Sequence, residues 1–182
     1  TIPPYLAQFR DKGAPLDEIL SLPINILMAA DGNKKSPLYA TMEELEKKHR
    51  NLVWLRNGPL LNDKREPLTF DATAQLVYAS SDFLLNPALY EPCGLTQLIG
   101  MQFGTIPIVT AEGGLRNTVI DFSNAHPHGN GFIVNPNTPE EMVRTVKKAL
   151  TVAAPRTRMH KQIVRNCMRA DHSWKTRLPA YY

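Results

Sequence analysis

The sequence is poor in cysteine, and it contains no long hydrophobic run. Cys93 and Cys167 are the only cysteines among 182 residues, too few for a disulfide framework or a cysteine-based metal site. No apolar stretch approaches the roughly 18 residues that a membrane-spanning helix needs, and no N-terminal segment has the form of a signal peptide. We therefore expect a protein of a reducing compartment that does not cross a membrane, most simply the cytoplasm.

Charge is not concentrated in any part of the sequence. Lysine and arginine number 21 against 17 aspartates and glutamates, which gives a net charge of +4 and a sequence pI near 9.1. The basic residues are scattered, with no run long enough to form a nucleic-acid-binding arm. We expect neither nucleic acid nor membrane as a partner, although the mild surplus would favour an anionic ligand such as a nucleotide diphosphate.

Residue groupings that indicate metal or nucleophilic chemistry are also lacking. His126 and His128 flank Pro127 in a glycine-rich loop, but no further ligand stands nearby in the sequence, and a zinc site needs three or four. The spacing of Ser, His and Asp shows no triad, and no Gly-x-Gly-x-x-Gly marks a nicotinamide site. We expect no metal and no cofactor.

Short apolar runs alternate with helical patterns along the chain. The sequence is 43% hydrophobic, which is close to the globular norm. Apolar runs predict strands at 5–9, 24–30, 51–55, 82–86, 105–109 and 131–134. Helical spacing predicts helices from Pro15 and over 41–50, 71–80, 95–103, 138–150 and 156–170. The alternation predicts an α/β fold with a doubly wound parallel sheet in one domain, residues 1–182, which collects ligands at the carboxyl ends of its strands.

Two predicted helices have recognisable start signals. Thr41 with Glu44 has the form of a capping box, and Thr138, followed by Pro139 and Glu141, has the features of a second capped start. Behind this second start, apolar residues recur at helical spacing and predict a buried stripe: Met142, Val143, Val146, Ala149 and Leu150.

The stretch Tyr90–Leu98 connects the predicted strand at 82–86 to the next helix. A helix start leaves backbone N–H groups unpaired at the positive end of the helix dipole, which favours phosphate. Gly94 would allow close approach to the backbone, and Glu91 can accept hydrogen bonds from hydroxyls. On local grounds alone, an ordinary strand-loop-helix of an α/β protein is an equally good interpretation.

Two motifs in order carry a more specific signal. The run Glu91-Pro92-Cys93-Gly94-Leu95, followed by Gly113-Gly114-Leu115, resembles the donor-binding half of bacterial glycogen synthases and plant starch synthases. The resemblance implies that the chain forms one Rossmann-like lobe of a two-lobed GT-B glycosyltransferase. Such an enzyme would transfer the sugar with retention of its configuration. Many relatives in the wider superfamily carry a second glutamate where this sequence has Ile99, and glycogen and starch synthases also lack it.

The resemblance also implies roles for individual residues. Glu91 would be the catalytic-site carboxylate that binds the donor sugar. The backbone N–H groups of Gly94, Leu95 and Thr96 would hold the diphosphate, and Cys93 would belong to the same donor-binding segment. Gly113, Gly114 and Leu115 would lie against the same ligand. At Cys93, packing is the favoured role of the side chain.

The sequence departs from the family pattern at two places. Lys12-Gly13 fits the end of a basic loop that supplies an arginine and a lysine to the diphosphate, but the arginine position holds Ala7-Gln8, so Arg10 would have to substitute. Glu112 stands where a small polar residue is usual, and an acid beside a diphosphate would repel it. We expect Glu112 to point away from the ligand or to weaken its binding.

The predicted function follows from the resemblance. The chain would be the nucleotide-sugar-binding C-terminal domain of an enzyme that transfers glucose from ADP-glucose, or UDP-glucose, to an α-1,4-glucan held by a preceding lobe. The isolated domain would turn over little. Two alternatives stay open: a glycosyltransferase of the same architecture with another donor or acceptor, and a non-catalytic nucleotide-sugar-binding module, which the altered basic loop and Glu112 favour.

Overall fold

The computed structural model describes residues 14–29, 35, 37–55, 60–123 and 125–177. The chain divides into two compact units, residues 1–77 and 78–182, and each is considered by itself. The strand expected at 5–9 and the basic residues Arg10 and Lys12 lie outside the described residues. The interpretation of 1–182 as one domain stays a prediction.

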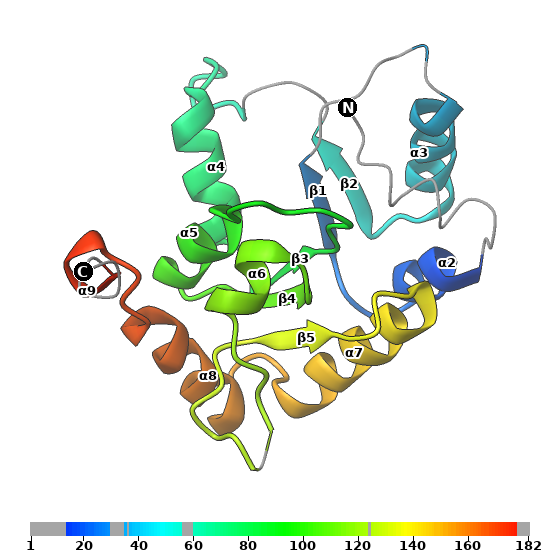
Figure 1. Ribbon diagram of the computed structural model, residues 1–182. Helices are drawn as coiled ribbons and strands as arrows, with labels where there is room; N and C mark the ends of the chain where they lie inside the picture. Colours follow the sequence, from blue (N-terminus) through cyan, green and yellow to red (C-terminus); the bar gives the residue numbers. More distant parts are fainter. Residues whose placement is uncertain (1–13, 30–34, 36, 56–59, 124, 178–182) are drawn as a thin grey trace. The chain divides into compact units, whose positions relative to one another are not determined.

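The first unit contains a two-stranded parallel sheet. Helix α2 (Ala14–Leu20) precedes strand β1 (Ile26–Ala29), and α3 (Pro37–Lys48) leads to β2 (Leu52–Leu55), which pairs with β1 (Figure 1). Helix α4 (Phe70–Ala79) crosses the boundary between the units.

An ionic contact joins α2 to the C-terminal end of α3 in the first unit. Asp17 Oδ1 accepts a hydrogen bond from Lys48 Nζ at 2.8 Å and lies 3.0 Å from His49 Nε2. The hydrogen bond from Lys48, and then that from His49, lowers the pKa of Asp17. The contact therefore connects α2 to the end of α3.

Helix α3 corrects one prediction. It begins at Pro37, so Thr41 lies inside the helix and the predicted capping box at Thr41 and Glu44 is wrong. Proline is well suited to the first position of a helix, because its missing N–H would have no partner there. The earlier start places Tyr39 and Met42 on the buried face.

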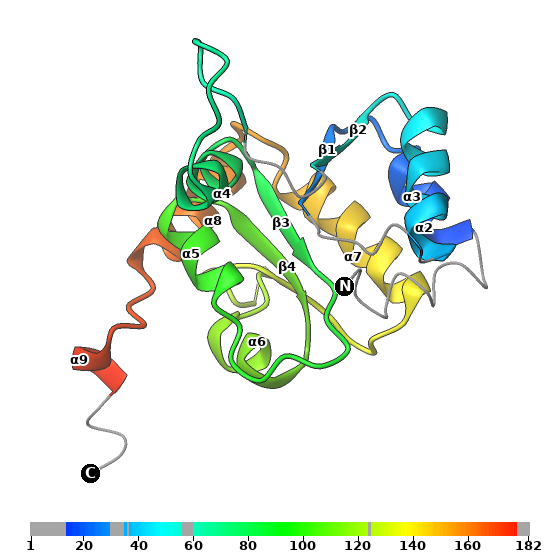
Figure 2. The same cartoon turned by 90° about the horizontal axis from the view of Figure 1, so that it is seen from above.

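The second unit contains a three-stranded parallel sheet in the order β3-β4-β5. Its elements are β3 (Phe83–Asn86), α5 (Thr96–Gln102), β4 (Ile106–Thr110), α6 (Gly113–Thr118), β5 (Phe132–Val134), α7 (Pro139–Val152), α8 (Arg158–Arg169) and α9 (Trp174–Arg177). Figure 2 shows α5 and α8 on one side of this sheet and α7 on the other. The predicted alternation of parallel strands and helices is confirmed, although the described strands form two sheets rather than one.

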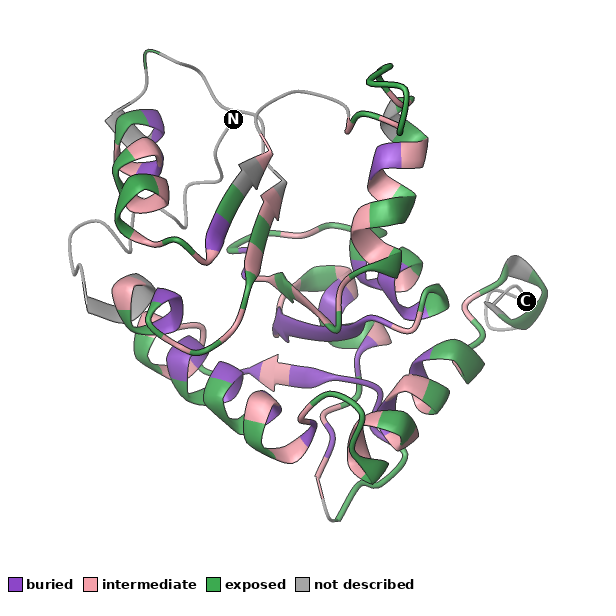
Figure 3. Ribbon diagram, turned by 180° about the vertical axis from the view of Figure 1, so that it is seen from behind, coloured by how far each residue is buried: buried purple, intermediate pink, exposed green. Residues whose placement is uncertain are grey.

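The core of the second unit surrounds its central strand. Every residue of β4 is buried, as Figure 3 shows. On α7 the predicted stripe is buried except for Leu150, which is half-buried. Thr138 caps this helix as predicted, accepting a hydrogen bond from the backbone N–H of Glu141 at 3.2 Å.

Helix α8 holds the histidine-containing loop in place. Asn166 Nδ2 donates to the carbonyls of Pro127 and Gly129, and the Sγ–H of Cys167 donates to the carbonyl of Asn130 at 3.0 Å. Burial raises the pKa of the Cys167 thiol to about 12. The two histidines of the loop are exposed.

Two negative findings apply to the part of the chain that the structure describes. Among those residues, no helix has the length and apolar character needed to cross a membrane. Within the same ranges, no three or more His, Cys, Asp or Glu side chains gather as a metal site would require.

Candidate functional site

The two sequence motifs follow neighbouring strands of the second unit. Strand β3 ends at Asn86 and β4 ends at Thr110, and the strands are parallel and adjacent. The carboxyl ends of parallel strands lie at one edge of a sheet, which is where α/β proteins bind ligands. Asn86 Nδ2 donates to Thr96 Oγ1 at 3.0 Å, and Thr110 Oγ1 donates to the carbonyl of Ala88 at 2.6 Å. Side chains at both strand ends therefore fix the segment that carries the first motif.

The two motifs are in direct backbone contact. The N–H of Gly114 donates to the carbonyl of Glu91 at 3.2 Å. A Cβ atom on Gly113 would lie 1.7 Å from the carbonyl oxygen of Glu91, and one on Gly114 would lie 1.7 Å from the carbonyl oxygen of Cys93. No side chain fits at either position, so both glycines are needed for this approach.

The Glu91 carboxylate is part of the turn itself. It is half-buried, and its Oε1 accepts a hydrogen bond from the N–H of Gly94 at 2.9 Å. Gly94 has φ +69°, a left-handed conformation that glycine adopts readily. A carboxylate offers about four acceptor positions. Glu91 is thus fixed by one bond while it stays capable of accepting bonds from ligand hydroxyls.

Gln97, a residue that the sequence did not single out, connects the two motifs through Thr118. Gln97 is fully buried, and its Nε2 donates to the carbonyl of Gly94 at 2.6 Å and to Thr118 Oγ1 at 3.0 Å. Thr118 Oγ1 donates in turn to the carbonyl of Gly114 at 2.7 Å. One signal was available: Gln97 lies four residues before the buried Met101, on the apolar face of its helix.

The remaining predicted site residues divide into exposed and buried positions. Cys93, Leu95 and Thr96 are exposed, which makes the packing role favoured for the Cys93 side chain wrong. The backbone carbonyl of Cys93 lies beside Gly114 of the second motif. Leu115 is fully buried in a small core cluster with Ala88, Val109 and Val119, and Ile133 packs against it. Leu115 therefore anchors the Gly113-Gly114 segment to this core cluster.

The Gly113-Gly114-Leu115 segment, predicted as a turn, opens the short helix α6. Glu112 is the residue before this helix and is half-buried, and its side chain makes no capping hydrogen bond there. The expectation that Glu112 points away from the ligand or weakens its binding stays a prediction.

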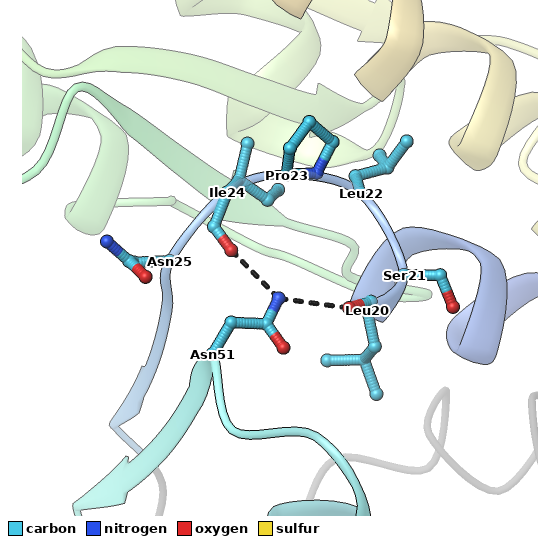
Figure 4. A pocket seen from close by; sticks show the side chains of 7 residues that line it. All are labelled: Leu20, Ser21, Leu22, Pro23, Ile24, Asn25 and Asn51. Carbon is cyan, nitrogen blue, oxygen red and sulfur yellow. Dashed lines mark hydrogen bonds between the residues drawn. The ribbon is translucent and has the colours of Figure 1, made fainter.

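The first unit contains an open hollow of about 320 Å³, lined by residues 20–25 and Asn51 (Figure 4). Asn51 Nδ2 donates to the carbonyls of Leu20 and Ile24 at 2.9 and 2.8 Å. This asparagine therefore closes the connection between α2 and β1. None of the predicted site residues that the structure describes lines the hollow, so we place the candidate site at the joined motifs instead.

Known proteins are similar to this chain in sequence and in fold. The family model described as "Glycosyl transferases group 1" matches residues 68–165. The chain is 40% identical over 115 residues to a glycogen synthase of Clostridioides difficile (strain 630), which covers 63% of this chain and 24% of that protein. It is 42% identical over 108 residues to a glycogen synthase of Kosmotoga olearia, with 59% and 22% covered. The chain thus spans about a quarter of the length of these curated relatives.

Solved structures show the same fold at low sequence identity. The catalytic domain of starch synthase IV from Arabidopsis thaliana, bound to ADP and acarbose, matches 100% of this chain and 35% of its own with a TM-score of 0.74 and 21% identity. Anabaena HepE in complex with UDP matches 96% of this chain and 45% of its own with a TM-score of 0.64 and 13% identity.

Proposed function

The chain belongs to the group 1 glycosyltransferases, and we propose that it is the donor-binding lobe of a glycogen- or starch-synthase-like enzyme. The proposed reaction moves glucose from ADP-glucose, or UDP-glucose, to an α-1,4-glucan with retention of configuration. Support comes from curated glycogen synthases at about 40% identity and from solved structures of similar proteins in complex with ADP or UDP.

The observation that carries the proposal is the backbone contact between the two motifs. Gly113 and Gly114 lie so close to the Glu91–Cys93 backbone that no Cβ fits. This close approach holds the Glu91 carboxylate beside the edge of the sheet where α/β proteins bind ligands.

The proposed division of labour assigns the sugar to Glu91 and the diphosphate to the backbone. Because the N–H of Gly94 donates to Glu91, the N–H groups of Leu95 and Thr96 are the proposed donors to the diphosphate. These donors would neutralise the charge that builds on the leaving group as the C–O bond breaks. Arg10 and Lys12 are proposed to complete the diphosphate contacts.

The wider proposals concern the rest of the enzyme. The glucan acceptor would bind a preceding lobe outside these residues. The transfer would use no metal and no other cofactor, and the protein would work in the cytoplasm, or in a plastid if it comes from a plant.

Calorimetric titration with ADP-glucose, UDP-glucose, ADP and UDP tests the proposal. We expect the chain to bind a sugar nucleotide more tightly than the matching nucleotide. Glu91→Ala should lose that preference, by about 10-fold or more because hydrogen bonds to a charged group are removed, while its affinity for the bare nucleotide stays.

Two further variants make the result specific. Glu91→Gln keeps an oxygen that can accept from the N–H of Gly94 and so separates loss of charge from loss of the turn. Glu140→Ala removes an exposed carboxylate of α7 and should bind as the unsubstituted chain does. If the chain binds none of the four ligands at millimolar concentration, or if Glu91→Ala weakens ADP and ADP-glucose equally, the proposal is wrong.

A further inference from the structure

We propose that Gln97 is a positioning residue that holds the Glu91–Gly94 turn in its sugar-binding conformation, an inference that rests on the proposed function for its ligand. Gln97 lies on α5, and its side-chain amide donates to Gly94 of the first motif and to Thr118, which in turn donates to Gly114 of the second motif. It does not itself reach the surface where a ligand would lie, since it is fully buried.

A closed ring of hydrogen bonds supports this role. Gly94 N–H donates to the Glu91 side chain, and the Gly94 carbonyl accepts from Gln97. Gln97 also donates to Thr118, and Thr118 donates to the carbonyl of Gly114. The N–H of Gly114 donates to the Glu91 carbonyl and so returns the ring to the residue where it began. Each member restrains the next, and Gln97 is the side chain that joins the first motif to α6.

The burial of Gln97 is not explained by packing alone. Its Oε1 is buried and meets no hydrogen-bond partner among the described residues. Burying an unsatisfied amide oxygen is unfavourable, and an apolar side chain of similar size would avoid it. The two hydrogen bonds that Nε2 donates, to Gly94 and Thr118, therefore best explain a glutamine at this position.

Gln97 also fits the unusual conformation of Gly94. A Cβ on Gly94 would lie 2.7 Å from Gln97 Nε2, so the amide occupies the space that a side chain would need. With Gly94 at φ +69°, its N–H points to Glu91 while its carbonyl points to Gln97. Loss of the Gln97 amide would free the peptide carbonyl of Gly94, and Glu91 would lose the fixed donor that orients its carboxylate.

The test uses Gln97→Met, which keeps the approximate volume and removes both donated bonds. The first measurement needs no ligand: amide hydrogen exchange of Gly94, followed by NMR in the 182-residue chain. We expect exchange at Gly94 to accelerate about tenfold relative to the amide of Ala149 in the core of α7. The second measurement is the dissociation constant of ADP divided by that of ADP-glucose, a ratio that should fall toward one.

A matched control is available on the same helix. Gln102 is exposed, and Gln102→Met makes the same chemical change without touching the ring. Should Gln97→Met fail to fold, Thr118→Val breaks the ring while leaving Gln97 in place, and Thr118→Ser restores the hydroxyl. If Gln97 positions the turn, Thr118→Val should accelerate exchange at Gly94 as Gln97→Met does, and Thr118→Ser should not.

The possible outcomes separate this inference from the proposed function. Unchanged exchange at Gly94 in Gln97→Met and Thr118→Val, or equal acceleration at Gly94 and Ala149, overturns the positioning role. If the unsubstituted chain does not prefer the sugar nucleotide, the proposed function is wrong, and the exchange measurement still decides whether Gln97 holds the turn.

Discussion

Gly114, like Gly113, has no room for a side chain, and this makes it a sensitive position in the site. In Gly114→Ala the new Cβ would lie 1.7 Å from the carbonyl oxygen of Cys93 and 2.5 Å from its carbonyl carbon. Backbone atoms cannot rotate away as a flexible side chain can, so the two motifs must separate. We expect a loss of about 3 kcal/mol or more in the free energy of unfolding, together with loss of nucleotide binding. Chemical denaturation and titration measure the two effects.

Gly100 provides the control for this substitution. It is a buried glycine of the same unit, but a Cβ there would meet the flexible end of Leu84 at 3.2 Å rather than backbone. Because alanine also favours the helix, Gly100→Ala should change stability by less than about 1 kcal/mol. Similar losses in both variants would mean that the contact between the motifs does not carry the effect.

At the scale of the element, α7 depends on its cap. Thr138→Ala removes the acceptor for the N–H of Glu141 and should lower the free energy of unfolding by about 1 kcal/mol. Thr138→Ser keeps a hydroxyl in the same place and should retain most of the stability. Thermal or denaturant unfolding measures both variants. A loss in Thr138→Ser as large as that in Thr138→Ala would assign the effect to the methyl group instead.

Local sequence signals predicted some elements well and failed at others for identifiable reasons. The cap at Thr138 was predictable because proline and acids follow it directly. The same Thr-x-x-Glu spacing at Thr41, without a proline after the threonine, lies one turn inside α3, so this spacing alone does not identify a helix start. Two successive glycines favour a turn over a helix. Helix α6 nevertheless forms, because Leu115 is buried and both glycines pack on the first motif.

At the scale of the whole molecule, the alternation of strands and helices was predictable, whereas the contacts among them were not. The order of motifs showed that Glu91 and Gly114 follow strand ends, and parallel pairing then predicts that they lie near one another. Gln97 was missed because glutamine is an ordinary helix residue at a surface, and only the packing of α5 shows that it is buried. The separation into two units, each with its own sheet, likewise depends on contacts between distant residues.

The last prediction concerns turnover by the chain alone. In the proposed enzyme the acceptor binds a preceding lobe, and closure of two lobes excludes water from the reacting groups. The chain spans about a quarter of the length of its curated relatives. We therefore expect the 182-residue chain to bind donor but to transfer no measurable glucose from ADP-glucose to a glycogen primer. The measurement is incorporation of labelled glucose, with the full-length Clostridioides difficile glycogen synthase as positive control and Glu91→Ala as background. Elongation above that background would show that these residues hold a complete active site and would contradict the assignment as a donor lobe.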